Sequence, residues 1–269
     1  TTNHRRSPRR SANAGPASGL GRIPSGLGPC SLTGSIAGPI TVSITGPITG
    51  SITGRAVMSI LLTILLAAAA FILGAFLWSF AEYLLHRFAM HELKGKGMMS
   101  REHLEHHVRS TWSFSVTHIL SWIGMLLVGA VLWMPIGWIL VGPVAGIALA
   151  LGWACGYFFY EYQHAVAHRR APKNRYQRWV RQNHFQHHFG QPMKNHGVST
   201  LIWDKAFGTY VQTELVRVPR RLALPWMVEN GELLPEFTDT YILVGALDDS
   251  ERLAAIDRAR AFASIAPPD

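Results

Sequence analysis

The sequence predicts an all-α fold, an integral-membrane helical bundle with a cytosolic, histidine-rich helical cap. Residues 59–81 and 110–160 contain no Lys, Arg, Asp or Glu. Uncharged apolar stretches of this length are typical of membrane-spanning helices, which need about 20 residues each. Ten of the 13 histidines lie in four short clusters beside these stretches. Most of their spacings place the side chains of a cluster on one face of a helix.

The net charge of +9 is concentrated in the first 57 residues, which hold six arginines and no acidic residue. The remainder has 19 basic and 16 acidic residues. No aromatic residue is interleaved with the N-terminal arginines, so nucleic acid is not an expected partner. The two cysteines, Cys30 and Cys155, form no C-x-x-C pair. They therefore indicate neither a disulfide nor a zinc finger.

Residues 1–57 are rich in Gly, Ser, Pro and Thr, with near-repeats in GPITVSITGPITGSITG. A segment of this composition cannot bury enough apolar surface to offset its chain entropy, so we expect a disordered low-complexity tail. It lacks the layout of a signal peptide. Met58 opens the first apolar run, and we expect it to be the native start, with the tail as translated upstream sequence.

The apolar runs predict a membrane domain over residues 58–212, with spans near 59–85, 112–134 and 137–160 and a tight turn at Pro135–Gly137. The turn is uncharged, whereas the histidine-bearing segments are rich in Lys and Arg. By the positive-inside rule, the histidines face the cytoplasm in a multi-pass membrane protein. Residues 213–269 are expected to form a cytosolic C-terminal extension. Its last helix, over 250–266, should place Leu253, Ile256 and Ala259 on one face and cover or brace the histidines.

The histidine clusters form two similar halves, each with a spaced pair, a basic spacer and an H-x-x-H-H box. The candidate metal ligands are His86, His91, His103, His106 and His107 in the first half, and His164, His168, His184, His187 and His188 in the second. Imidazole is a common protein ligand for transition metals. Ten ligands are too many for one ion, so two ions are predicted. A set of imidazoles suits Zn, Cu, Fe or Ni and does not choose among them.

His86 and His91 do not fit a regular α-helix, because residues five apart point about 140° away from each other. Either the helix breaks before His91, or the two histidines serve different metals. His118 lies on the second predicted span, beyond His107. We expect it to be a helix-packing histidine.

Three acidic residues are candidate partners of the ligand histidines. Glu82 lies one turn before His86, and Glu161 lies three residues before His164. Each carboxylate can accept the second ring N–H of a ligand histidine. The alternative is an interfacial carboxylate paired with an arginine. Asp204 is expected to be a structural turn residue.

The order of the motifs resembles the fatty acid hydroxylase/sterol desaturase superfamily of integral-membrane di-iron oxygenases. The motifs are H-x4-H at 86–91, H-x2-H-H at 103–107, Y-E-x-x-H-x3-H at 160–168, H-x2-H-H at 184–188 and GVSTLIWDKAFGT at 197–209. The resemblance covers roughly residues 59–212 and is greatest to the fatty acid 2-hydroxylase branch. His196 stands where the family usually shows an aromatic residue. It is left as an extra ligand, a substrate contact or a loop histidine bonded to the backbone.

The resemblance implies that residues 58–212 are a membrane hydroxylase domain. The ten histidines would bind two iron ions, which zinc can replace in purified protein, and O2 would be the co-substrate. The implied reaction is hydroxylation of a C–H bond in a fatty acyl lipid chain. Nothing in the sequence resembles a fused cytochrome b5 domain, so a separate electron donor is expected, such as cytochrome b5 or ferredoxin.

Two other functions stay open. Within the same superfamily, the alternative is a desaturase or a sterol or carotenoid oxygenase. From another class, the alternative is a membrane metal transporter, which would place its ligands along a pore at mid-membrane. Hydrolytic zinc chemistry is not favoured, because the sequence contains no H-E-x-x-H string to supply a general base.

Overall fold

The computed structural model describes residues 49–247 and 250–269. Most of the expected disordered tail, residues 1–48, therefore lies outside the described residues. The rest of that expectation was wrong, because helix α1 (Thr49–Leu84) begins before residue 57. Adding a residue to an existing helix costs far less than starting one. The apolar helix therefore extends into the end of the low-complexity segment.

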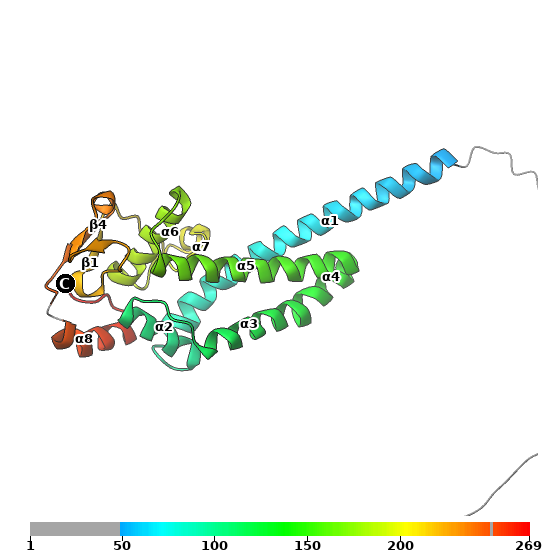
Figure 1. The fold of residues 1–269 in the computed structure, drawn as a ribbon. Helices are drawn as coiled ribbons and strands as arrows, with labels where there is room; N and C mark the ends of the chain where they lie inside the picture. Colours follow the sequence, from blue (N-terminus) through cyan, green and yellow to red (C-terminus); the bar gives the residue numbers. More distant parts are fainter. Residues whose placement is uncertain (1–48, 248–249) are drawn as a thin grey trace, which may run out of the picture. The chain divides into compact units, whose positions relative to one another are not determined.

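The N-terminal half consists of helices (Figure 1). Helix α1 continues into the π-helix η1 (Leu85–Glu92), and α2 (Met98–Arg109) follows. Helix α3 (Val116–Val128), the π-helix η2 (Gly129–Trp133) and α4 (Met134–Leu140) form one continuous rod, and α5 (Pro143–Arg169) returns beside it. Three helical stretches, 53–92, 116–140 and 143–169, are long and apolar enough to cross a membrane. The prediction of a membrane helical protein is confirmed.

The tight turn between the second and third spans lies at Val141 and Gly142, not at Pro135–Gly137 as expected. Pro135 sits in the first turn of α4, directly after η2. A proline is tolerated at the start of a regular helical segment, where its missing N–H breaks no ladder. Gly142 has φ +133°, which a residue with a side chain rarely adopts. The glycine therefore makes the turn that the proline does not.

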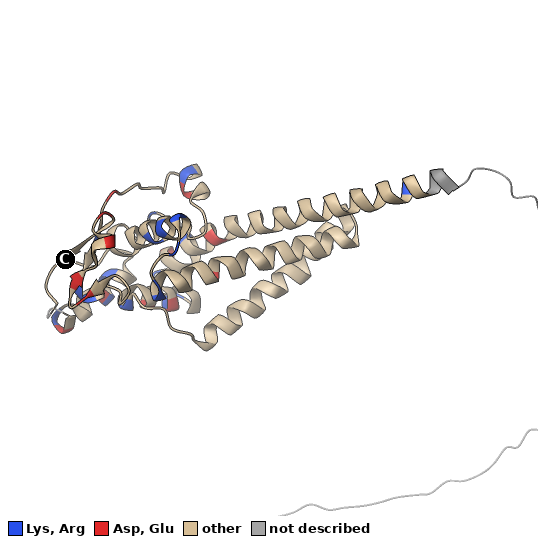
Figure 2. Cartoon of the chain, turned by 45° about the horizontal axis from the view of Figure 1, so that its top comes forward, with Lys and Arg blue, Asp and Glu red and all other residues tan. Residues whose placement is uncertain are grey.

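Helices α1 and α5 pack closely because glycines face backbone at the crossing. A Cβ at Gly152 would lie 1.9 Å from the Phe71 carbonyl oxygen, and one at Gly74 would lie 2.1 Å from that of Leu149. Toward the histidine end, Trp78 packs on Trp153 and Tyr157 with ring centroids 5.3 and 4.9 Å apart. The uncharged lengths of these helices contrast with the other end of the bundle, where Lys, Arg, Asp and Glu gather (Figure 2).

The C-terminal half adds short elements to this bundle. Helix α6 (Arg175–Phe185), the π-helix η3 (Gln186–Gly190) and α7 (Ile202–Ala206) precede strand β1 (Val216–Pro219) and the 3-10 turn η4 (Arg220–Leu222). Strands β2 (Val228–Glu229) and β3 (Glu232–Leu233), the turn η5 (Pro235–Phe237), strand β4 (Tyr241–Val244) and helix α8 (Ser250–Phe262) follow. β1 pairs with β4 in parallel and β2 with β3 antiparallel. The fold is thus mostly helical, with two small sheets in the extension.

The extension shares an apolar core with α6 and η3, which includes Phe185, Val216, Leu224, Met227 and Tyr241. Helix α8 begins at Ser250 as expected, but its buried face was predicted wrongly. Leu253, Asp257 and Ala261 are buried, whereas Ile256 is 46% exposed. Arg221 binds the Asp257 carboxylate with two hydrogen bonds of 2.9 and 2.7 Å. This pair turns a polar residue inward, which apolar periodicity alone does not reveal.

Candidate metal centre

The ten clustered histidines gather in two groups of five. Within each group, one ring nitrogen from every histidine lies within 4.8 Å of the others. The first centre contains His86, His91, His103, His107 and His187, and the second contains His106, His164, His168, His184 and His188. All are buried except His106, which is partly exposed. The structure therefore contains two histidine clusters able to bind metal ions.

The two halves of the sequence exchange one histidine. In each H-x-x-H-H box, the first and last histidines join their own half, and the middle one joins the other centre. His106 lies about 100° from His107 around an ideal helix, whereas His103 and His107 are only about 40° apart. The expectation that each box presents all three imidazoles in one direction was therefore too simple. Each centre therefore contains one histidine from the other half of the sequence.

The π-helix η1 resolves the conflict over His86 and His91. Both belong to the first centre, and their ring centroids are 5.2 Å apart. A π-helix forms i→i+5 hydrogen bonds, so residues five apart lie near each other along its axis. Both expected alternatives were wrong, because η1 continues to Glu92 without a break and the two histidines share one group. The second box also includes π-helical residues, since His187 and His188 lie in η3.

Five of the ten histidines have Nδ1 directed at an oxygen outside their group. In the first centre the partners are the His196 carbonyl for His86, the Ser264 hydroxyl for His91 at 3.2 Å and the Lys194 carbonyl for His187 at 2.8 Å. In the second centre they are the Thr111 carbonyl for His106 at 3.1 Å and the Ser110 carbonyl for His168 at 3.0 Å. A carbonyl only accepts, so the Nδ1 atoms that face one carry the hydrogen. Their Nε2 atoms are then left with lone pairs.

These Nε2 atoms point at one another. His91 and His187 are 3.0 Å apart, and His106 and His168 are 3.1 Å apart, measured between Nε2 atoms. Lone pairs that face each other at such distances repel, and a cation between them converts the repulsion into coordination. The donor set therefore fits a metal ion in each centre.

The protonation state also suits metal binding. Burial holds the pKa of His103 and His187 well below the ordinary value, and neighbouring imidazoles lower it further. Burial lowers the pKa of His106 to about 4, although its bond to Thr111 works in the opposite direction. The imidazoles are thus neutral at physiological pH, which is the form that coordinates a metal.

Two acidic residues hold the loop that supplies the partner of His86. The Glu82 carboxylate accepts hydrogen bonds from the backbone N–H groups of Val198 at 2.6 Å and Ser199 at 2.8 Å. Asp204 accepts from the N–H groups of His196 at 2.9 Å and Gly197 at 2.8 Å. Glu82 therefore contacts the loop, and neither the His86 ring nor an arginine as the two expected alternatives had it. Burial raises the pKa of Asp204, but hydrogen bonds from His196, Gly197 and Thr209 outweigh it and keep the pKa below its ordinary value.

His196 lies beside the first centre without joining the group of five. Its ring centroid is 5.6 Å from those of His86 and His187. Its Nδ1 is 3.5 Å from an Asp204 carboxylate oxygen. Its backbone carbonyl, rather than its ring, supports His86. Of the readings left open for this residue, the loop histidine matches its position best.

Arg181 was not identified from the sequence, yet it is fully buried at the second centre. Its guanidinium donates to the carbonyls of Val166 at 2.7 Å, Arg170 at 2.7 and 3.0 Å and Gln177 at 3.0 Å. It thereby satisfies the carbonyls at the C-terminus of α5, where helices favour a cation, and joins α5 to α6. Burial lowers its pKa to about 10, so it stays charged. No local pattern distinguishes it from the exposed arginines around it.

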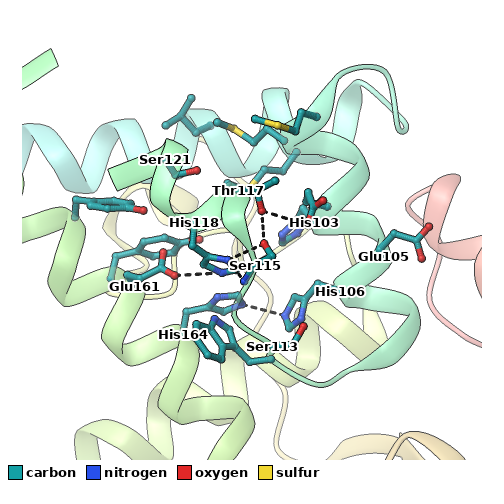
Figure 3. Close-up of a pocket in the computed structure, with 18 of the residues that line it drawn as sticks. His103, Glu105, His106, Ser113, Ser115, Thr117, His118, Ser121, Glu161 and His164 are labelled. Carbon is teal, nitrogen blue, oxygen red and sulfur yellow. Dashed lines mark hydrogen bonds and ion pairs between the residues drawn. The ribbon is translucent and has the colours of Figure 1, made fainter. Parts of the chain in front are cut away.

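A cavity of about 360 Å³ borders both centres, because His103, His106 and His164 line it (Figure 3). Its apolar wall includes Trp78, Leu85, Met90, Met125 and Tyr157, and its polar wall includes Ser115, Thr117, His118, Ser121 and Glu161. The volume lies within the range of about 300–1,000 Å³ typical of small-molecule sites.

Glu161 and His118 face each other in the polar wall of this cavity (Figure 3). The Ser115 N–H donates to His118 Nδ1 at 3.2 Å. His118 Nε2 therefore carries the hydrogen and lies 3.5 Å from a Glu161 oxygen. Glu161 thus pairs with His118 instead of orienting His164, and His118 is more than a packing residue.

The fold and the site define a class, a helical membrane protein with two five-histidine clusters that border one cavity. The family profile named fatty acid hydroxylase matches residues 71–209, a range that includes all ten histidines. The chain belongs to this family, and the resemblance seen in its motifs is confirmed.

Several curated proteins are similar to this chain. It is 28% identical over 157 residues to dihydroceramide fatty acyl 2-hydroxylase FAH1 of Arabidopsis thaliana, covering 54% of this chain and 62% of that protein. It is 32% identical over 146 residues to human fatty acid 2-hydroxylase, covering 52% and 38%. These alignments span less than two thirds of either relative. A solved structure, full-length scs7p with only the hydroxylase domain visible, is 23% identical with a TM-score of 0.40 and covers 55% of this chain and 57% of that one.

Proposed function

We propose that this protein is an O2-dependent di-iron hydroxylase that inserts oxygen into a C–H bond of a fatty acyl lipid chain. The observation that carries the proposal is that both histidine clusters border one cavity beside membrane-spanning helices. Membership of the fatty acid hydroxylase family supports it, as do relatives whose names describe fatty acyl 2-hydroxylation.

The ten histidines would hold the metal ions, five to each, through ring-nitrogen lone pairs. In five of them, the Nδ1 contact leaves the Nε2 lone pair free. Bound iron would supply the activation of O2 and the attack on an unactivated C–H bond, which no side chain performs alone. The all-imidazole donor set also accepts zinc, so iron is favoured by the family rather than by the ligands. Glu82 and Asp204 would fix the position of His86 through the 196–199 loop.

The cavity would orient the lipid and exclude water from the reacting carbon. Its apolar wall, with Trp78, Leu85 and Met125, suits an acyl chain that enters from the membrane. On the polar wall, the Glu161 carboxylate faces His118 and can accept a hydrogen bond from a polar group of the lipid. Such placement of the substrate contributes a large part of rate enhancement in enzymes.

The reaction needs reducing equivalents from another protein. Insertion of one oxygen atom from O2 leaves the second as water and consumes two electrons and two protons. We infer that a separate donor, such as cytochrome b5 or ferredoxin, supplies the electrons at the histidine-bearing end. Lys and Arg gather there, whereas the turn between α4 and α5 is uncharged (Figure 2). By the positive-inside rule, this end faces the cytoplasm.

Lipid mass spectrometry on cells that express the full chain tests the proposal. We expect acyl chains that gain one oxygen, with fragmentation locating the carbon. A double variant, His187→Ala with His188→Ala, is the control, checked for equal amount in the membrane fraction. Loss of two hydrogens instead would identify a desaturase. No lipid change, combined with faster metal uptake by the cells, would identify a transporter.

A further inference from the structure

The C-terminal segment, which lies beyond the family-matched region 71–209, reaches the first centre through Ser264. The Ser264 Oγ lies 3.2 Å from His91 Nδ1 and donates its own hydrogen to the His91 carbonyl at 3.3 Å. With its hydrogen committed there, the hydroxyl oxygen can only accept from His91 Nδ1. This contact assigns the hydrogen of the His91 ring to Nδ1 and leaves a lone pair on Nε2.

We propose that Ser264 is a positioning residue for the first centre, and that its hydroxyl aims His91 Nε2 at the bound ion. The inference rests on the proposed role of the histidines as metal ligands. The His91 Nε2 lies 3.0 Å from that of His187 and 2.9 Å from that of His103. A rotation of the His91 ring would remove one of the five nitrogens from this group. Partners that orient a ligand histidine typically affect metal affinity or activity by about 10–100-fold.

The backbone conformation at Ser264 supports a functional role for its hydroxyl. Ser264 is buried and has φ +56°, in the left-handed region at the end of α8. The Ser264 N–H donates to the Ala261 carbonyl and the Ile265 N–H to the Arg260 carbonyl, both at 2.8 Å. Glycine is the residue that most often ends a helix in this conformation. Serine adopts it at a cost in strain, and it brings a hydroxyl that glycine lacks.

Helix α8 is held firmly enough to position this hydroxyl. Arg221 and Asp257 form a buried, two-bonded ion pair between η4 and α8. Arg258 pairs with Glu105 on α2. The Phe262 ring packs against the backbone of Gly95, where a Cβ would lie 2.7 Å from the ring. The end of α8 is therefore fixed against α2 and against the loop that joins η1 to α2.

The second centre does not use this segment for its Nδ1 contacts. His106 and His168 direct Nδ1 at the Thr111 and Ser110 carbonyls, which lie inside the family-matched region. Removal of the Ser264 hydroxyl should thus affect the first centre more than the second. This gives the proposal a readout that a general loss of folding would not produce.

The test measures metal retention by the purified full chain, loaded with iron and then challenged with a chelator. The Ser264→Gly variant removes the hydroxyl and relieves the left-handed strain, so its thermal stability should not fall. We expect the ion of the first centre to leave about 10–100-fold faster than in the wild type, with a much smaller change for the ion of the second centre. Ser264→Asn, whose side-chain oxygen can replace the hydroxyl and whose backbone tolerates positive φ, should restore retention. Ser250→Gly, at the other end of α8, is the matched control.

Equal retention of both ions by Ser264→Gly and the wild type would overturn the proposal. An equal acceleration of the loss of both ions, or a loss that Ser264→Asn does not reverse, would also overturn it. These results are separate from the lipid assay. A wild-type chain that holds two ions and oxidises no lipid would defeat the proposed function while leaving the role of Ser264 measurable.

Discussion

The two histidine centres have the same donor set but are built differently. The second centre takes its pair, His164 and His168, from regular turns of α5. Its Nδ1 acceptors, Ser110 and Thr111, are adjacent residues after α2. The first centre takes its pair from a π-helix. The acceptors for His86 and His91 lie 110 and 173 residues away along the chain. The comparison teaches that equal ligand sets can be built on regular α-helix spacing in one case, and on a π-helix with acceptors from more distant segments in the other.

Removal of an exchanged histidine should have the largest effect. His106→Ala is expected to empty the second centre and His187→Ala the first, although each residue lies in the box of the other half. Because a ligand is lost rather than its partner, hydroxylation should fall by more than about 100-fold in both variants. Iron per chain and lipid oxidation are the measurements. The assignment would be wrong if His106→Ala lost the ion that is sensitive to Ser264→Gly.

Substitution of Asp204 should weaken the first centre selectively. Asp204→Ala leaves the His196 and Gly197 N–H groups without their acceptor. Each buried unsatisfied donor costs about 1–3 kcal/mol, so the loop that supplies the His86 partner should loosen. We expect a loss of metal affinity of about 10-fold in the first centre and a lower unfolding temperature. Asp204→Asn, which keeps an acceptor oxygen, should show a smaller effect. Equal weakening of both centres would contradict this account.

Arg181→Lys should weaken the second centre in turn. A lysine keeps the charge but not the fork of donors that reaches Val166, Arg170 and Gln177. Loss of two or more of these charged hydrogen bonds should destabilise the chain by about 2–4 kcal/mol and loosen His168 and His184. Thermal unfolding and metal retention check this. Arg178→Lys, on the same helix with its side chain 43% exposed, is the control and should behave like the wild type.

Glu161→Gln should affect neither centre and should raise KM. The glutamine keeps the shape of the side chain but loses the charge that faces His118 and the cavity. Weaker acceptance of a hydrogen bond from the lipid should raise KM by up to about 10-fold, since 1.4 kcal/mol is a factor of ten. Iron content should stay at the wild-type value. A variant that lost iron would place Glu161 among the supports of a centre after all.

The sequence predicts the membrane helices and the ten histidines well because both signals are local. Uncharged runs and i, i+4 spacings are read within one element, and the mirrored halves indicate two metals. The sequence did not reveal how the histidines of each H-x-x-H-H box are divided between the two centres. The spacing of His103, His106 and His107 already implied different directions around the helix. Only the tertiary contacts of His106 with His164 and His168 on α5 assign the middle histidine to the other centre.

Other features could not be predicted because they depend on contacts between distant segments. Regular α-helix spacing places His86 and His91 on different faces, and amino-acid composition does not reveal the π-helix that brings them together. Pro135 was expected to form a turn, yet it lies within a continuous helical rod because the π-helix η2 directly precedes it. Glu82 stood one turn from His86 and instead binds backbone 116 residues away. Ser264 gave no signal at all, because one serine at a helix end resembles many others.

The stacked rings of His107 and His188 have a consequence for the order of metal uptake. The rings come from different centres, yet they are parallel to within 5° with centroids 4.0 Å apart. An ion that fixes one ring removes the rotational freedom of the other, and the second ion then binds without that entropic cost. Such coupling is reciprocal, whichever centre fills first. Titration with metal should therefore show positive cooperativity, with chains that hold a single ion rarer than independent sites would give.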